Sequence, residues 1–242
     1  MPFPPRLQFA GATYHVSTRA TGPSEFFRTP YDYRGFLVIL ERAVEKYGLL
    51  LHAYCLMVTH YHLVVTTPEP NIARGMQYLN SIYARAFNKR YGRLGHFVAA
   101  RYSSPLIETE GHAYEVTRYV PLNPVRAELC ALPEEYPWSS YAATIGLREE
   151  PAFLDSSWIL RLFGEDLSTA RRTLRDFVEA ARVSETRERP ESVLDDAAAL
   201  AVGHPPAVAV VTRVTREEFP SARSLARPSR EGDSPWPRAP RE

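Results

Sequence analysis

Two histidines separated by one residue stand inside an apolar segment of this chain. The stretch YCLMVTHYHLVVTTPEP, residues 54–70, is hydrophobic for most of its length but contains His60 and His62. Side chains two residues apart on a β-strand point to the same face, so both imidazoles would project together. They are either two buried histidines satisfied by neighbouring groups or two ligands of one metal ion. A metal site would need a third ligand.

A second group of candidate residues occurs in RYVPLNPVRA, residues 118–127, where Tyr119 and Asn123 are four positions apart. On a helix they would share a face. If that helix lies against the strand carrying the histidines, two imidazoles, an amide oxygen and a phenol would converge. This set suits phosphodiester cleavage, in which a metal polarises a phosphate oxygen and Tyr119 attacks phosphorus in line. The phosphotyrosine product remains an ester, so a later DNA hydroxyl can displace it.

The ligand set indicates which cofactor to expect. Two neutral imidazoles and an amide leave the double charge of a cation facing the phosphate, which makes a good Lewis acid. Mixed nitrogen and oxygen ligands are compatible with Mg²⁺ or Mn²⁺, and zinc is not excluded. An alternative is that Tyr119 is ordinary packing and that a water molecule is the nucleophile.

Positive charge is concentrated in one part of a nearly neutral chain. The formal net charge is +1, yet no acidic residue occurs between Glu69 and Glu108. The interval contains these basic residues: Arg74, Arg85, Lys89, Arg90, Arg93 and Arg101. Tyrosines and phenylalanines alternate with them, and guanidinium groups bind phosphate while aromatic rings stack on unpaired bases. A solvated basic helix is the alternative, but an acid-free run of this length favours a nucleic-acid partner.

The order of predicted elements gives the fold class. Periodicity and turn residues predict a strand at 12–19, a helix at 31–48, strands at 49–58 and 60–67, a helix at 72–92, a strand at 96–108 and a shorter helix at 112–120. Gly48 is a plausible stop for the first helix and Asn71 a cap for the second. This order is that of a ferredoxin-like α+β domain, an antiparallel sheet with helices packed on one face.

The C-terminal part of the chain has a different pattern. Two amphipathic helices are predicted at 154–164 and 166–183, each opened by Asp or Ser capping residues. From about Ser184 onward proline and arginine are frequent and no periodicity persists, which indicates a largely disordered tail. We therefore expect a catalytic and DNA-binding domain at 1–145, a helical extension at 146–183 and a tail at 184–242.

Composition excludes some classes of protein. The chain has 242 residues, of which 45% are hydrophobic, so it can bury a sizeable core. No segment has the length and apolarity of a signal peptide or a transmembrane helix. Cys55 and Cys130 form no redox or metal-binding spacing, and a cytoplasmic protein with reduced thiols is the simplest interpretation.

Several ordered motifs resemble a known family, the insertion-sequence-200-like transposases of the His-hydrophobic-His single-strand nuclease class. The similarity is greatest to their repeat-associated tyrosine transposase branch. It covers about residues 1–145 and includes, in order, GATYHVSTR, LHAYCLMVTHYHLVV, LNSIYARAFNKRYGRLGHF, RYVPLNPVRAEL and YPWSSY. The chain departs from the family at three places: Val58-Thr59 stands where Pro-Asn is usual, Ala100-Arg101-Tyr102 where Gly-Arg-Phe is frequent, and Pro121 follows two residues after Tyr119.

The resemblance implies a ferredoxin-like fold, a divalent metal and single-stranded or hairpin DNA as substrate. It implies that His60 and His62 are the metal pair, Asn123 the third ligand and Tyr119 the nucleophile of a 5′-phosphotyrosine intermediate. The active unit would be a monomer or a homodimer. Two other functions remain open: a domesticated protein that binds DNA without cleaving it, and a metal-dependent phosphodiesterase that uses water.

Overall fold

The computed structural model describes residues 8–22, 24–99 and 101–188 of the chain. Its contacts divide these residues into two compact units. The first unit holds the residues up to Leu51 together with 56–107, and the second holds 52–55 and the residues from 108 onward. No helix within the described ranges is long and apolar enough to cross a membrane. The domain boundaries at 145 and 183 remain predictions.

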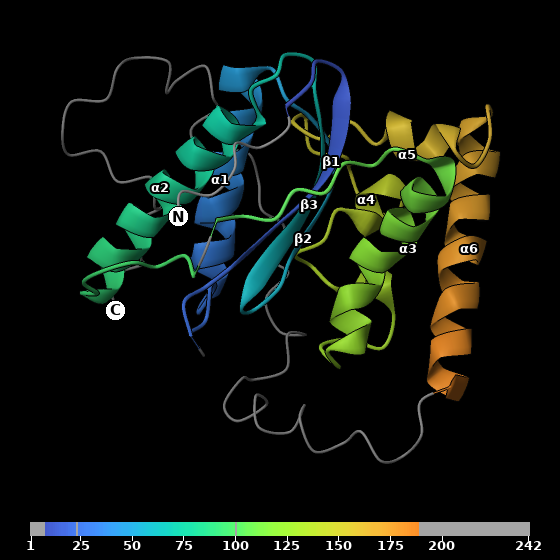
Figure 1. Ribbon diagram of the computed structural model, residues 1–242. Coiled ribbons are helices and arrows are strands. Elements are labelled where there is room, and N and C mark those ends of the chain that lie inside the picture. The colour runs from blue at the N-terminus through green and yellow to red at the C-terminus, as the bar shows by residue number, and fades with distance from the viewer. Residues whose placement is uncertain (1–7, 23, 100, 189–242) are drawn as a thin grey trace. The chain divides into compact units, whose positions relative to one another are not determined.

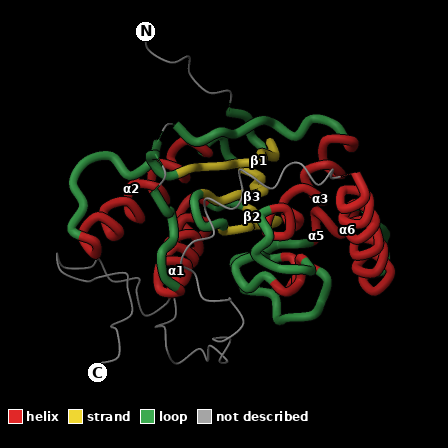
Figure 2. The backbone as a smooth tube through the Cα atoms, turned by 90° about the horizontal axis from the view of Figure 1, so that it is seen from below, coloured by secondary structure: helices red, strands yellow, loops and turns green. Residues whose placement is uncertain are grey.

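A three-stranded antiparallel sheet carries the histidine pair. Its strands are β1 (Ala12–Arg19), β2 (Leu50–Leu56) and β3 (His60–Thr67), in the order β1-β3-β2 (Figures 1 and 2). The register of β1 against β3 places Ala12 opposite Thr67 and Arg19 opposite His60. The bounds of β1 and β3 coincide with the predicted strands, because a run of strand-forming residues ended by turn residues marks both.

A two-residue turn, Val58 and Thr59, joins β2 to β3 and determines where the histidine strand begins. The turn is closed by a hydrogen bond of 2.8 Å from the N–H of Met57 to the carbonyl of His60. The carbonyl of Val58 accepts hydrogen bonds from the backbone N–H groups of Phe26 and Phe27, at 2.7 and 3.1 Å. The unusual turn sequence is therefore held by the segment that precedes the first helix.

Two helices, α1 (Pro30–Tyr47) and α2 (Ile72–Tyr91), cover one face of the sheet and enclose an aromatic core. The ring centroids of Phe36 of α1 and Tyr61 of β3 are 4.8 Å apart. Tyr83 of α2 stacks on the buried ring of Phe26. Both helices end at a glycine in the left-handed region, which a residue with a Cβ rarely adopts. The predicted α+β fold, with an antiparallel sheet and helices on one face, is confirmed.

Residues 96–108 do not form the regular fourth strand that was predicted. They lie antiparallel to β1, and the bridges that join them are isolated rather than continuous: Tyr14 to Leu106, Ser17 to Ser103 and Ala20 to Val98. Between the last two bridges, three steps from Ser17 to Ala20 match five steps from Ser103 to Val98, so the register of the pairing shifts by two residues and the regular ladder is interrupted. Proline at position 105, which has no N–H, removes a further ladder donor.

The second unit is mainly helical. Its elements are α3 (Glu110–Arg126), a 3₁₀ turn η1 (Pro133–Glu135), α4 (Tyr141–Thr144), α5 (Ser157–Arg161) and α6 (Leu167–Glu188). The prediction for α3 was wrong at its C-terminal end, because the helix continues through two prolines. Helix α6 runs to Glu188, five residues beyond the last residue of the helix predicted at 166–183. The rest of the predicted tail, 189–242, lies outside the described residues.

Candidate functional site

His60 and His62 lie on the face of β3 that points away from the aromatic core. Tyr61 between them points the other way and is completely buried; its hydroxyl accepts from Thr18 Oγ1 and donates to Asn80 Oδ1, both at 2.9 Å. The two imidazole rings are 4.9 Å apart between centroids and perpendicular to each other. The expectation that both imidazoles project together is confirmed.

Both imidazoles are neutral at neutral pH because the fold lowers their pKa values. Burial, and then the positive charge of Arg19, lowers the pKa of His60 to about 4. Burial lowers the pKa of His62 to about 2, and the neighbouring imidazoles of His60 and His15 add to the effect. A neutral imidazole keeps a nitrogen lone pair, which is the form of histidine that binds a metal ion.

A third histidine, His15 on β1, contacts this pair. The register places Ser17 opposite His62, so His15 is the diagonal neighbour of His62 on the same face. His15 Nε2 lies 3.0 Å from His62 Nδ1, and the two rings stack with centroids 5.2 Å apart and planes inclined by 27°. Reasoning from the sequence missed His15, whose only signal was its position in the alternating segment GATYHVSTR.

The donors on this face fit a divalent cation with mixed nitrogen and oxygen ligands. His60 and His62 offer two neutral imidazoles side by side, and Nδ1 of His60 is 3.0 Å from Thr59 Oγ1, which leaves its Nε2 for a cation. Within the described part of the chain, no group of three or more His, Cys, Asp or Glu side chains is arranged to hold a metal ion. Amide, water and phosphate oxygens are ligands that would complete the coordination of such a cation.

The helix α3 carries Tyr119 and Asn123 in one continuous turn despite its prolines. Asn123 is buried, and its Nδ2 donates to the carbonyl of Tyr119 at 2.7 Å and reaches that of Val120 at 3.5 Å. Pro124 has no N–H to offer the Val120 carbonyl, so the side-chain amide supplies a donor near the gap. Because the nitrogen of this amide is used by the helix, its oxygen is the atom that could bind a cation.

Tyr119 is accessible to a large substrate. Tyr119 as a whole residue is 39% exposed, and the guanidinium of Arg126 lies 5.0 Å from the centroid of its ring. The structure thus brings predicted site residues together within each unit: His60 with His62 in the first, and Tyr119 with Asn123 in the second.

The predicted DNA-binding residues lie on α2 and in the segment after it. Five are exposed: Arg74, Arg85, Lys89, Arg90 and Arg101. The sixth, Arg93, is half-buried, with its guanidinium 5.6 Å from the ring centroid of Phe97. Arg90 also forms an ion pair of 3.9 Å with the buried carboxylate of Asp32, so its charge is partly used inside the fold.

The aromatic residues of the basic segment divide into two groups. Three belong to the core: Tyr83, Phe87 and Phe97. Three others are partly exposed: Tyr78, Tyr91 and Tyr102. Of these six rings, those of the second group are accessible for stacking on a base.

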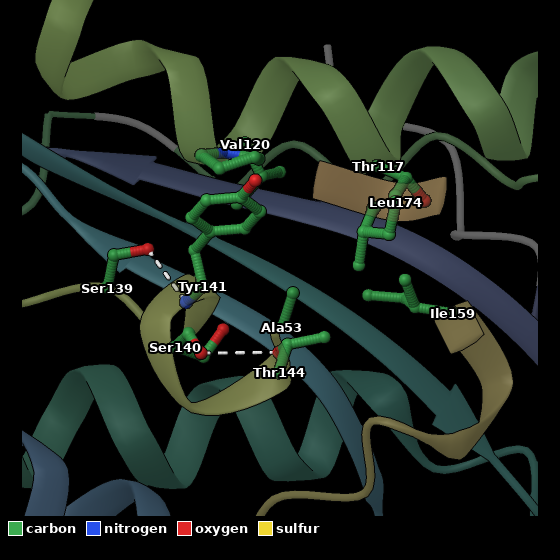
Figure 3. Close-up of a pocket in the computed structure, with 10 residues that line it drawn as sticks. Ala53, Thr117, Val120, Ser139, Ser140, Tyr141, Thr144, Ile159 and Leu174 are labelled. Carbon is green, nitrogen blue, oxygen red and sulfur yellow. Dashed lines mark hydrogen bonds between the residues drawn. The ribbon is translucent and has the colours of Figure 1, made fainter. Parts of the chain in front are cut away.

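A small cavity lies on the buried side of α3 (Figure 3). Thr117 and Val120 of this helix line it together with Tyr141 and Leu174 of the same unit. Its volume of about 20 Å³ has room for one water molecule and none for a nucleotide. The accessible chemistry of α3 is therefore on its other side, with Tyr119.

Comparison with known proteins relates the chain to one family and to one solved structure. A family described as IS200-like transposase matches residues 9–122. No curated protein sequence matches this chain. Among solved structures, the chain is similar to the REP-associated tyrosine transposase bound to a REP hairpin, with 14% identity and a TM-score of 0.53. The similarity covers 69% of this chain and 93% of the other, and it shows a common fold.

Proposed function

We propose that this protein is a metal-dependent tyrosine transposase that cleaves and rejoins single-stranded hairpin DNA, because the IS200-like transposase family matches residues 9–122. The observation that carries the proposal is the pair of neutral imidazoles, His60 and His62, side by side on one face of β3. Two such groups can supply nitrogen ligands to a divalent cation, and a bound cation could polarise a phosphodiester.

Tyr119 is the proposed nucleophile. Its phenolic oxygen attacks phosphorus and loses its proton, while the bond from phosphorus to the 3′ oxygen breaks and that oxygen takes up a proton. The products are a free 3′-hydroxyl and a 5′-phosphotyrosine. A second DNA 3′-hydroxyl then displaces the phenol, so the strands are rejoined without an external source of energy.

The proposed cation is Mg²⁺ or Mn²⁺, held by His60, His62 and the amide oxygen of Asn123. When bound, it would polarise a phosphate oxygen and offset the charge that develops in the transition state. The chain's own contribution is to keep two imidazoles deprotonated and to direct the Asn123 nitrogen into the helix. The proposal requires Tyr119 and Asn123 to reach the phosphate on which His60 and His62 act.

The structural neighbour is a transposase bound to a REP hairpin, and this supports a hairpin as the substrate proposed here. A folded single strand offers dense phosphate beside unpaired bases. The exposed cations of α2 are suited to the phosphates, and the partly exposed tyrosines are suited to stacking on the unpaired bases.

The test is a covalent adduct formed with labelled hairpins drawn from DNA that flanks the coding region. In Mn²⁺, a strand labelled at its 3′ end should migrate with the protein on a denaturing gel, whereas a 5′ label should appear only in a shortened free product. This asymmetry follows because the tyrosine keeps the 5′ phosphate of the downstream fragment.

Tyr119→Phe should abolish the adduct. Tyr114→Phe is the matched control, since it removes a hydroxyl from the same helix that donates to the carbonyl of Leu162 at 2.8 Å; its adduct should persist. Cleavage that continues in Tyr119→Phe would instead identify a water nucleophile. Binding of several hairpins without any adduct would identify a protein that only binds DNA.

A further inference from the structure

The third histidine of the sheet has no place in the reaction described so far. His15 is on β1, and its contact with His62 is specific in two ways: a 3.0 Å approach between Nε2 of one ring and Nδ1 of the other, and a stacked ring pair. Both rings come from regular positions of the β1–β3 ladder, which fixes their relative placement. The question is what this contact does to His62.

The hydrogen bond between His15 Nε2 and His62 Nδ1 contains a single proton, and the position of that proton decides what His62 can bind. If His62 Nδ1 donates, the lone pair of His62 is on Nε2. If His15 Nε2 donates, the only proton of His62 is on Nε2 and blocks that nitrogen. Since Nδ1 is used by the hydrogen bond in both cases, Nε2 is the nitrogen of His62 that remains for a cation.

His60 is held in the same manner by a different neighbour. Its Nδ1 lies 3.0 Å from Thr59 Oγ1, a hydroxyl that is able to accept a proton. Each candidate metal ligand is therefore fixed through Nδ1 by a group that can accept, and each has Nε2 on the other side of its ring. Partners of this kind set the tautomer and orientation of metal-binding histidines.

We propose that His15 is a positioning residue: its Nε2 accepts the Nδ1 proton of His62 and so keeps the Nε2 lone pair of His62 available to a divalent cation. The inference rests on the metal site of the proposed function and is independent of the role of Tyr119. It assigns to the GATYHVSTR segment a part in metal binding.

Two substitutions separate the hydrogen bond from the packing of the ring. His15→Phe keeps a ring that can stack on His62 but removes the acceptor, and His15→Gln keeps an acceptor without the ring. Thr13→Val is the matched control, because it breaks a 2.7 Å hydrogen bond to Thr66 Oγ1 on the same strand pair without touching His62. Circular dichroism of each full-length variant verifies that it is folded.

The first readout is the tautomer of His62 in the metal-free protein, measured by long-range ¹H–¹⁵N correlation after labelling the histidines. Wild type, His15→Gln and Thr13→Val should show the Nδ1–H form, and His15→Phe should shift toward the Nε2–H form. The second readout is Mn²⁺ affinity, measured from the electron paramagnetic resonance signal of free Mn²⁺. His15→Phe should bind about 10- to 100-fold more weakly, and His15→Gln should recover most of the loss.

Three results would overturn the inference: an Nε2–H tautomer in wild type, unchanged Mn²⁺ affinity in folded His15→Phe, or equal loss in the Phe and Gln variants. These are distinguishable from failure of the proposed function. If Mn²⁺ affinity depends on His15 but no phosphotyrosine adduct forms, the inference stands and the transposase chemistry falls. If the adduct forms and Mn²⁺ affinity does not depend on His15, the transposase chemistry stands and the inference about His15 falls.

Discussion

At the scale of single residues, Asp32 shows why a basic sequence pattern overstates the surface charge available to DNA. Its carboxylate is completely buried at the start of α1 and accepts hydrogen bonds from the N–H groups of Arg28 and Thr29 and from the hydroxyl of Tyr91. The charge is balanced by Arg90, which comes from α2. One of the six cations assigned to DNA binding therefore also supports the fold.

Arg90→Ala and Arg85→Ala should consequently differ. Removing Arg90 leaves a buried carboxylate without its ion pair, so we expect a loss of about 1–2 kcal/mol in the free energy of unfolding as well as weaker DNA binding. Arg85 is exposed and bonds the Ser81 carbonyl of its own helix at 3.3 Å, so its removal should leave stability unchanged. Urea unfolding and hairpin titrations measure the two effects.

The salt dependence of binding gives the control for this comparison. Each lost phosphate contact should reduce the slope of log affinity against log salt concentration by about 0.7–0.9. An Arg85→Ala variant with the wild-type slope would show that this face of α2 does not contact phosphate.

At the scale of elements, α3 depends on a side chain to bridge a defect in its own backbone. Two prolines inside the helix, Pro121 and Pro124, remove the N–H groups that would bond the carbonyls four residues earlier. Asn123 donates toward this region through its amide nitrogen. Asn123, which the resemblance implies as a metal ligand, thus also stabilises the helix that carries Tyr119.

A double-mutant cycle measures how much Asn123 contributes to the stability of α3. We expect Asn123→Ala to lower the free energy of unfolding by about 1–2 kcal/mol, because it leaves buried carbonyls with poorer donors. In a Pro124→Ala background the restored N–H can bond the Val120 carbonyl, so the same substitution should cost less. Equal costs in both backgrounds, read from urea unfolding, would contradict this account.

At the scale of the whole molecule, buried neutral histidines tie stability to pH. His52 is buried, stacks on Trp158 with centroids 5.2 Å apart and has Nδ1 2.8 Å from the carbonyl of Asp155. Burial lowers its pKa, as it lowers those of His60 and His62. The unfolded chain therefore binds protons that the folded chain does not.

Stability should fall as the pH drops below about 6.5, the ordinary histidine pKa, because protonation then favours the unfolded chain. Each histidine that stays neutral in the fold should contribute a loss of about 1.4 kcal/mol per pH unit in that range. Urea unfolding between pH 7.5 and 5, with a chelator present, measures the slope. His52→Asn keeps a group near the Nδ1 position without a titratable proton and should flatten the slope; an unchanged slope would mean that His52 is protonated in the fold.

Local pattern was sufficient for much of the fold. Strand-forming runs located β1 and β3 to the residue, and the glycine stop at Gly48 located the end of α1, because both signals depend on neighbours within a few positions. The same reasoning failed for 96–108 and for α3. There the outcome depended on a shift of register against β1 and on a side chain that donates hydrogen bonds near a missing backbone donor.

The sequence by itself determined that His60 and His62 share a face, since the strand period requires it. That Tyr119 and Asn123 share a helix became certain only with the structure, in which α3 continues past residue 120. Only the tertiary structure decided that His15 lies against His62, that Arg90 neutralises a buried carboxylate and that half of the aromatic residues of the basic segment are core. The physical reason is that register between strands and burial between helices arise from contacts distant in sequence, which no local period encodes.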